Sequence, residues 1–165
     1  MSNEIYTAPQ SQLNLEAETG NILASRWSRM FASILDTFVI MIVLVPVMYL
    51  TGAFDGIAKG VEPSLGYNLA VGSLGLLVFV IANGKLLISN GQTIGKKILG
   101  IKIVDLDGGV PDLSKHLLKR YAVYFIPGQV PIAGQIFSIV NIIFIFGKQK
   151  RCVHDYAAGT KVVVS

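Results

Sequence analysis

Three long apolar runs divide the chain, and polar or basic segments separate them. The first run covers residues 30–50 and the second covers residues 66–88. An α-helix rises about 1.5 Å per residue, so about twenty residues make a helix of roughly 30 Å, enough to cross the hydrocarbon core of a bilayer. Each of these two runs therefore predicts one transmembrane helix.

The third apolar run, residues 121–146, is interrupted early by Pro127 and Pro131. Its length suits one crossing, but proline breaks the hydrogen bonding of a helix. The run therefore either spans once or turns back as a re-entrant hairpin. Basic residues are concentrated in residues 85–120 and 148–161. The positive-inside rule places both groups on one side, which favours the hairpin.

The pattern changes between the second and third runs. Residues 101–104 alternate as in a short strand, and residues 161–164 are a plausible partner for it. Residues 112–121 place leucines on one helical face and basic residues on the other, which predicts an amphipathic helix along the membrane interface. Pro111 or Asp112 can start this helix. The expected fold class is an all-α membrane protein: two transmembrane helices, a proline-broken third segment, an interfacial helix and a short cytoplasmic β element.

The polar N-terminal segment, residues 1–25, has neither the basic start nor the early apolar run of a secretory signal. We expect it to be a partly disordered cytoplasmic arm, followed by one membrane domain over residues 26–164.

Composition supports a lipid-facing surface. Hydrophobic residues make up 52% of the 165 residues and charged residues only 15%, whereas soluble domains carry about 25% charged residues. The net charge of +4 forms no continuous basic face, which favours contact with anionic lipid headgroups over nucleic acid. The single cysteine, Cys152, excludes an intrachain disulfide.

Asp36 is the most informative single residue, because it falls about 9 Å into the first predicted span. A carboxylate there costs at least about 2.5–3.5 kcal/mol, so it must face protein or water. Such a residue marks an ion path, a proton relay or a ligand site, or else an ion pair that packs helices. Arg29 shares its helical face but lies about 10 Å away along the axis, so each is expected to meet a third group. Arg29 alternatively anchors the helix at the interface.

The glycine-rich segment over residues 91–97, GQTIGKK, lacks the Walker spacing, because asparagine and lysine stand where glycine and Ser or Thr are required. We expect loop contacts or lipid-headgroup contacts from five side chains in and after it: Gln92, Thr93, Lys96, Lys97 and Arg120.

Residues near the C-terminus offer little chemistry. His154 and Asp155 lack a nearby nucleophile, and with His116 they make only a weak metal site, so we expect no enzyme, metal or cofactor. If the tail returns to the side of the N-terminus, Asp155 can pair with Arg29. Three polar residues recur at intervals of three in the third run: Gln135, Ser138 and Asn141. They either face Asp36 or form hydrogen bonds between helices.

Three segments together carry a family resemblance: RMFASILD at 29–36, GQTIGKKILGIKIV at 91–104 and HDYAAGT at 154–160. In this order they resemble the RDD family, which is named for one arginine and two aspartates. The resemblance covers roughly residues 26–164. It implies a charged triad of Arg29, Asp36 and Asp155, in a multi-pass protein of the bacterial cytoplasmic (inner) membrane whose N-terminus is cytoplasmic.

The resemblance leaves two functions open. Transport of unidentified ligands has been suggested for the family, and some members look like monovalent cation/proton antiporters, in which Asp36 would be the intramembrane site. The alternative is a non-catalytic accessory or assembly subunit of a larger membrane complex, with the triad as a structural lock. Expected partners are the lipid bilayer, anionic headgroups, and either further copies of the chain or other membrane subunits.

Overall fold

The computed structural model describes residues 22–128, residue 130 and residues 133–165. Most of the predicted N-terminal arm lies outside the described residues. Two long apolar helices dominate the molecule, α2 (Arg26–Leu50) and α4 (Leu65–Asn90), and both are long and apolar enough to cross a membrane. Most of their apolar side chains are exposed, as lipid-facing helices require.

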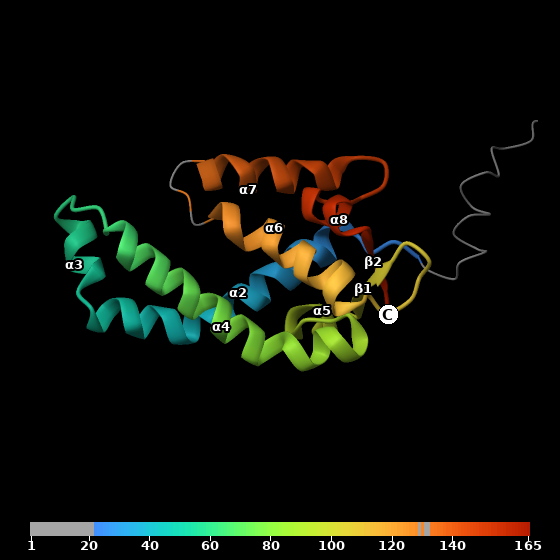
Figure 1. Ribbon diagram of the computed structural model, residues 1–165, viewed down its shortest axis with the longest axis horizontal. Helices are drawn as coiled ribbons and strands as arrows, with labels where there is room; N and C mark the ends of the chain where they lie inside the picture. Colours follow the sequence, from blue (N-terminus) through green and yellow to red (C-terminus); the bar gives the residue numbers. More distant parts are fainter. Residues whose placement is uncertain (1–21, 129, 131–132) are drawn as a thin grey trace, which may run out of the picture.

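Local sequence signals fix the ends of these helices. Ser25 and Ser64 are the N-caps, and each hydroxyl accepts a hydrogen bond from a backbone N–H of the first turn. Pro46 lies inside α2 without ending it. The short helix α3 (Ala53–Ala58) connects the two long helices at the far end of the molecule (Figure 1).

The third apolar run folds back on itself. A single π-helical turn, η1 (Leu113–Leu117), continues directly into α6 (Leu118–Gly128), and α7 (Ala133–Ile143) with the 3₁₀ turn η2 (Phe144–Phe146) returns beside it (Figure 1). Arg26 Nε donates to the carbonyl of Ile145 at 3.1 Å, so the returning end reaches the start of α2. The 11 residues of α6 make a helix of only about 16 Å. In the structure this run therefore forms two short helices that pack against each other.

The predicted amphipathic helix over residues 112–121 is therefore not a separate element. Asp112 caps it as expected, because its carboxylate accepts from the backbone N–H groups of Ser114 and Lys115. The helix then continues into the third apolar run without a break, because no glycine or proline follows until Pro127.

A small sheet lies at the end of the molecule opposite α3 (Figure 1). The predicted strands β1 (Ile101–Asp105) and β2 (Thr160–Val164) pair antiparallel, with Ile103 opposite Val162. Residues 22–24 add to the other edge of β2, where the N–H of Ala24 donates to the carbonyl of Val162 at 3.0 Å. This part of the predicted disordered arm is therefore built into the sheet.

Two short helices complete this end, α5 (Ile94–Ile98) and α8 (Val153–Ala158). The buried apolar core joins the sheet to the long helices through eight residues: Ala24, Ala32, Phe79, Leu87, Ile101, Ile103, Leu117 and Val162. Beside this core, α5 packs against α2 and α8 packs against α6, and the charged residues of the sequence analysis meet there.

Candidate functional site

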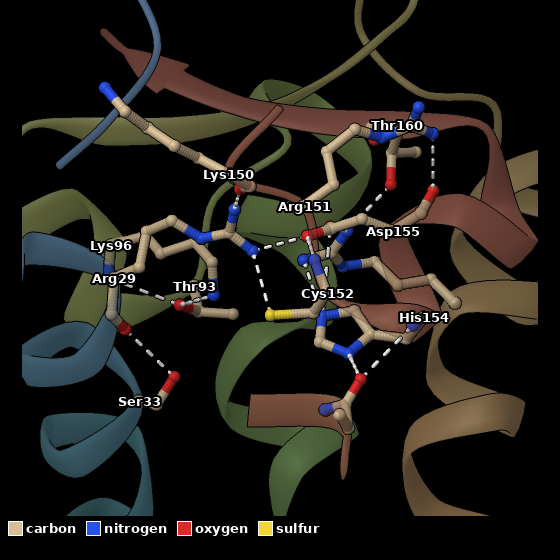
Figure 2. A network of polar contacts seen from close by, with 12 residues as sticks. Arg29, Ser33, Thr93, Lys96, Lys150, Arg151, Cys152, His154, Asp155 and Thr160 are labelled. Carbon is tan, nitrogen blue, oxygen red and sulfur yellow. Dashed lines mark hydrogen bonds and ion pairs between the residues drawn. The ribbon is translucent and has the colours of Figure 1, made fainter. Parts of the chain in front are cut away.

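Asp155 is fully buried between two arginines (Figure 2 shows Arg29 and its contacts). One carboxylate oxygen accepts from Arg29 on α2, and the other accepts from Arg120 on α6. The backbone N–H of Cys152 also donates to Asp155 Oδ2 at 2.8 Å, which caps the start of α8. Arg29, Arg120 and Asp155 are called the Asp155 cluster below.

Each arginine of the cluster also holds a second element. Arg29 donates to the carbonyl of Lys150, and Arg120 Nη1 donates to the hydroxyl of Thr160 at 2.7 Å. The Asp155 cluster therefore ties α2, α6 and α8 to the start of β2. The predicted pairing of Arg29 with Asp155 is confirmed.

His154 extends this network to the returning helix of the hairpin. Arg120 Nη2 lies 3.1 Å from His154 Nε2, and Asn141 Oδ1 lies 2.9 Å from His154 Nδ1. A guanidinium only donates, so Nε2 accepts and the ring proton is on Nδ1, facing the amide oxygen. Burial, and next the positive charge of Arg120, lower the pKa of His154 well below its ordinary value. His154 is therefore neutral at pH 7.

The same charges keep Asp155 ionised. Burial alone raises the pKa of the Asp155 carboxyl, but the guanidinium groups of Arg120 and Arg29 outweigh burial and lower it well below its usual range. Donor atoms of Cys152, His154 and Asp155 lie within 4.8 Å of one another, close enough to suggest a metal site. The trio does not fit a cation, because two arginines occupy the carboxylate, both ring nitrogens are hydrogen-bonded and burial raises the pKa of the Cys152 thiol.

Asp36 lies on α2, as Arg29 does, and forms a second site. It contacts neither Arg29 nor Arg120. Thr93 Oγ1 donates to Asp36 Oδ2 at 2.6 Å, and the backbone N–H of Gly95 donates to Oδ1 at 2.8 Å. Lys96 Nζ lies 4.0 Å from Asp36 Oδ2 and 3.4 Å from Thr93 Oγ1. Asp36, Thr93 and Lys96 are called the Asp36 site below.

Gly95 explains how α5 comes so close to α2. A Cβ atom at this position would lie 2.1 Å from the carbonyl oxygen of Ala32 and 3.1 Å from the carboxyl carbon of Asp36. Only glycine leaves room for its N–H to reach the carboxylate. Gly95 of the GQTIGKK segment therefore serves helix packing.

Lys96 is the unusual cation of this region. Burial, and next the charge of Arg120, lower its pKa to about 8, although Asp36 opposes the shift. Among the residues that the structure describes, the buried region holds three cations, Arg29, Lys96 and Arg120, against two carboxylates. Lys96 is therefore the positive charge that the region gives up most readily.

Four of the five side chains expected to contact headgroups or loops are buried: Gln92, Thr93, Lys96 and Arg120. Gln92 and Thr93 do make contacts within the loop region, whereas Arg120 is removed from headgroups by its bonds to Asp155 and Thr160. Of these five side chains, only Lys97 is exposed.

Two further buried polar residues carry only a weak signal in the sequence. Arg120 is one arginine among several basic residues, and only the fold shows that it is the second partner of Asp155. Asn83 lies fully buried in α4, where its Oδ1 accepts from the N–H of Ile94 at 2.8 Å and so holds the start of α5. In the sequence, Asn83 is recognisable only as a polar residue inside an apolar run.

Two of the three regularly spaced polar residues in the third run form hydrogen bonds instead of facing Asp36. Asn141 binds His154 of α8, and Ser138 donates to the carbonyl of Gly134 within its own helix. Gln135 is exposed.

Comparison with known proteins gives one match. The family model described as the RDD family matches residues 23–159, which include every member of the Asp155 cluster and of the Asp36 site. No curated protein and no solved structure matches the chain.

Proposed function

The chain belongs to the RDD family, and from this membership and the geometry of its charged residues we propose that it exchanges a monovalent cation for a proton at Asp36. One observation carries the proposal: a buried lysine ammonium lies 4.0 Å from a buried carboxylate on a helix that can span a membrane. The cation and the Lys96 proton compete for the same carboxylate, so binding of one favours release of the other.

Lys96 supplies the proton in this scheme. Both oxygens of Asp36 accept hydrogen bonds from fixed donors, Thr93 and Gly95, so the carboxylate is held beside the ammonium of Lys96. With its pKa lowered to about 8, Lys96 can lose a proton close to physiological pH. An incoming cation then replaces the lost positive charge beside Asp36, and the net charge of the buried region is unchanged.

The Asp155 cluster has a supporting role in this proposal. It joins α2, α6 and α8 without touching Asp36, so it fixes the position of the helix that carries the carboxylate. The three residues of the predicted triad therefore divide between two places: Arg29 and Asp155 belong to the Asp155 cluster, and Asp36 belongs to the Asp36 site.

The same proposal places the chain in the bacterial inner membrane with both α2 and α4 crossing. Exposed Trp27 and Tyr49 lie near opposite ends of α2, where aromatic side chains favour the two interfaces. The hairpin of α6 and α7 enters from the side of Arg26 and reaches about halfway, because α6 is only about 16 Å long. Both ends of the chain are then cytoplasmic, and exposed Lys97 faces anionic headgroups.

A homo-oligomer completes the proposed pathway, because two spans and a half-depth hairpin form too thin a wall for one. Exposed apolar faces on both long helices provide surface for this contact. Blue-native electrophoresis of the purified protein measures the assembly: a closed homo-oligomer supports exchange, and a monomer contradicts it.

The test of exchange is proton flux in proteoliposomes that contain a trapped pH-sensitive dye, with Na⁺, K⁺ or Li⁺ added outside. We expect cation-driven proton movement in the wild type and none in Asp36→Asn. Asp55→Asn, which changes an exposed aspartate in α3, is the matched control and should behave as the wild type. Normal flux in folded Asp36→Asn contradicts the proposal.

A second candidate is a non-catalytic subunit of a larger membrane complex. It is favoured by the mutual pairing of the charges of the Asp155 cluster, which gives that cluster a purely structural role. Comigration with other membrane proteins on a blue-native gel, together with absence of flux for every cation tested, would select this candidate.

A further inference from the structure

The ammonium group of Lys96 is buried but weakly held. Among the residues that the structure describes, its Nζ atom has two polar contacts, 3.4 Å to Thr93 Oγ1 and 4.0 Å to Asp36 Oδ2. An ammonium group carries three N–H donors, and only the distance to Thr93 is short enough for a hydrogen bond. A buried charge with so few partners is costly, so Lys96 Nζ is a cation that another cation can replace.

The hydroxyl of Thr93 connects the ammonium to the carboxylate (Thr93 and Lys96 are both drawn in Figure 2). Its O–H donates to Asp36 Oδ2 at 2.6 Å, and its oxygen accepts from Lys96 Nζ. The same oxygen accepts from the backbone N–H of Lys96 at 3.3 Å, which caps the start of α5. A hydroxyl has one donor and two lone pairs, so all three are in use while Lys96 is charged.

The start of α5 is held from both long helices, and this fixes the position of the Thr93 hydroxyl. The N–H of Ile94 donates to Asn83 on α4 at 2.8 Å, and the N–H of Gly95 donates to Asp36 on α2 at 2.8 Å. Thr93 itself is only 1% exposed. A group that is already ordered loses little conformational entropy when a ligand binds, so the hydroxyl is well placed to bind one.

Loss of the Lys96 proton leaves two oxygen atoms beside the place that the ammonium held. A neutral amine no longer forms an ion pair with Asp36, and the flexible stem of a lysine lets its nitrogen move away. The lone pair of Thr93 that accepted from Nζ is then open. Thr93 Oγ1 and Asp36 Oδ2 lie 2.6 Å apart, so one cation can contact both. Hard cations bind oxygen ligands of this kind.

We infer that Thr93 Oγ1 is a ligand of the transported cation, which takes the place of the Lys96 ammonium between Thr93 and Asp36. The inference rests on the proposed function and adds to it a second ligand, contributed by the residue before α5. The hydroxyl keeps its O–H bond to Asp36 in both states, and one of its lone pairs changes partner from the ammonium to the cation.

The test measures proton flux in proteoliposomes over a range of Na⁺ concentrations and determines the half-saturating concentration. Thr93→Val removes the hydroxyl and keeps the shape of the side chain. Thr93→Gly also removes the hydroxyl, but glycine is well tolerated at an N-cap. Thr93→Ser restores both the hydroxyl and the cap. Ser64→Ala removes the N-cap hydroxyl of α4 and is the matched control for loss of a cap.

In Thr93→Val and Thr93→Gly we expect the half-saturating Na⁺ concentration to rise about ten-fold, on the scale of one hydrogen bond to a charged group. The rise should be equal in the two variants, because both lack the ligand although they differ in capping. Thr93→Ser and Ser64→Ala should keep the wild-type value. Thermal unfolding in detergent, titrated with NaCl against choline chloride, should give the same order and reports binding without flux.

A wild-type half-saturating concentration in Thr93→Gly overturns the inference, because the hydroxyl then acts only as a cap. A similar rise in Ser64→Ala also overturns it, since loss of a remote cap would then be sufficient. In both cases, flux that is present in the wild type and abolished by Asp36→Asn leaves the exchange proposal intact. Wild-type protein that shows neither a Na⁺-dependent shift nor any flux overturns the proposed function itself.

Discussion

Asp155 balances two buried guanidinium groups, so removing its charge should have a large effect. In Asp155→Asn, Arg29 and Arg120 remain buried without a counter-charge. Breaking such a buried network by loss of one partner costs about 3–5 kcal/mol. We expect the free energy of unfolding in detergent to fall by that amount, measured by denaturant titration. Asp107→Asn, at an exposed turn position, is the control and should change stability little; an equal loss in both variants would refute the structural role.

Lys96 predicts a dependence of stability on alkaline pH. Its pKa is 10.5 in the unfolded chain and about 8 in the folded protein, so the unfolded state holds more protons between these values. The stabilisation from neutral Lys96 is therefore fully present above pH 10.5, and it is lost as the pH falls from 10.5 through 8. We expect the free energy of unfolding to rise by about 3 kcal/mol from pH 8 to 10.5.

Two variants isolate the contribution of Lys96 to this pH dependence. Lys96→Met should abolish the rise, because no group remains there to titrate. Lys97→Met, which changes the exposed neighbour, should keep it. A rise of equal size in Lys96→Met would assign the effect to other groups.

At the scale of elements, the contact of α5 with α2 depends on one glycine. Gly95→Ala would bring a Cβ atom to 2.1 Å from the carbonyl oxygen of Ala32, so α5 must move and the hydrogen bond to Asp36 is lost. We expect a loss of stability of about 1–3 kcal/mol and faster cleavage by trypsin after Lys97. Gly84→Ala meets only Val80, at an ordinary 3.7 Å, and should leave both measurements unchanged. Equal cleavage rates in the two variants would contradict this packing.

At the scale of the whole molecule, the proposed topology puts the segments before and after the hairpin on one side of the membrane. Single cysteines at Asp55, Gly108 and Lys148, in a Cys152→Ser background, can be labelled with a membrane-impermeant maleimide. We expect positions 108 and 148 to be labelled from the same side and position 55 from the opposite side. Labelling of position 148 together with position 55 would mean that the third apolar run crosses the membrane once.

Much of the secondary structure was predictable from local pattern. The two long helices follow from runs of apolar residues longer than a bilayer core requires. The pairing of β1 with β2 follows from alternation in two short segments, and the start of η1 follows from the capping chemistry of Asp112. Glycine and proline placed the turn of the hairpin near Pro127.

The candidate site was predictable only in part. Asp36 and Asp155 stand out because a carboxylate in or beside an apolar run needs a partner, and the pairing of Arg29 with Asp155 followed once the tail returned to that side. Arg120 and Lys96 did not stand out, because in the sequence they are indistinguishable from basic residues at a membrane surface. Burial changes their chemistry, and burial depends on how α5 packs against α2 and how α6 packs against α8.

The sequence by itself determined that this chain has membrane-spanning character, which charged residues are costly to bury and which family motifs it carries, because these depend on composition and local spacing. The tertiary structure decided which partner each charge meets: Asp155 faces two arginines, and Asp36 faces Thr93, Gly95 and Lys96. The physical reason is that electrostatic energies depend on distance and desolvation, and both are set by contacts between residues far apart in the chain.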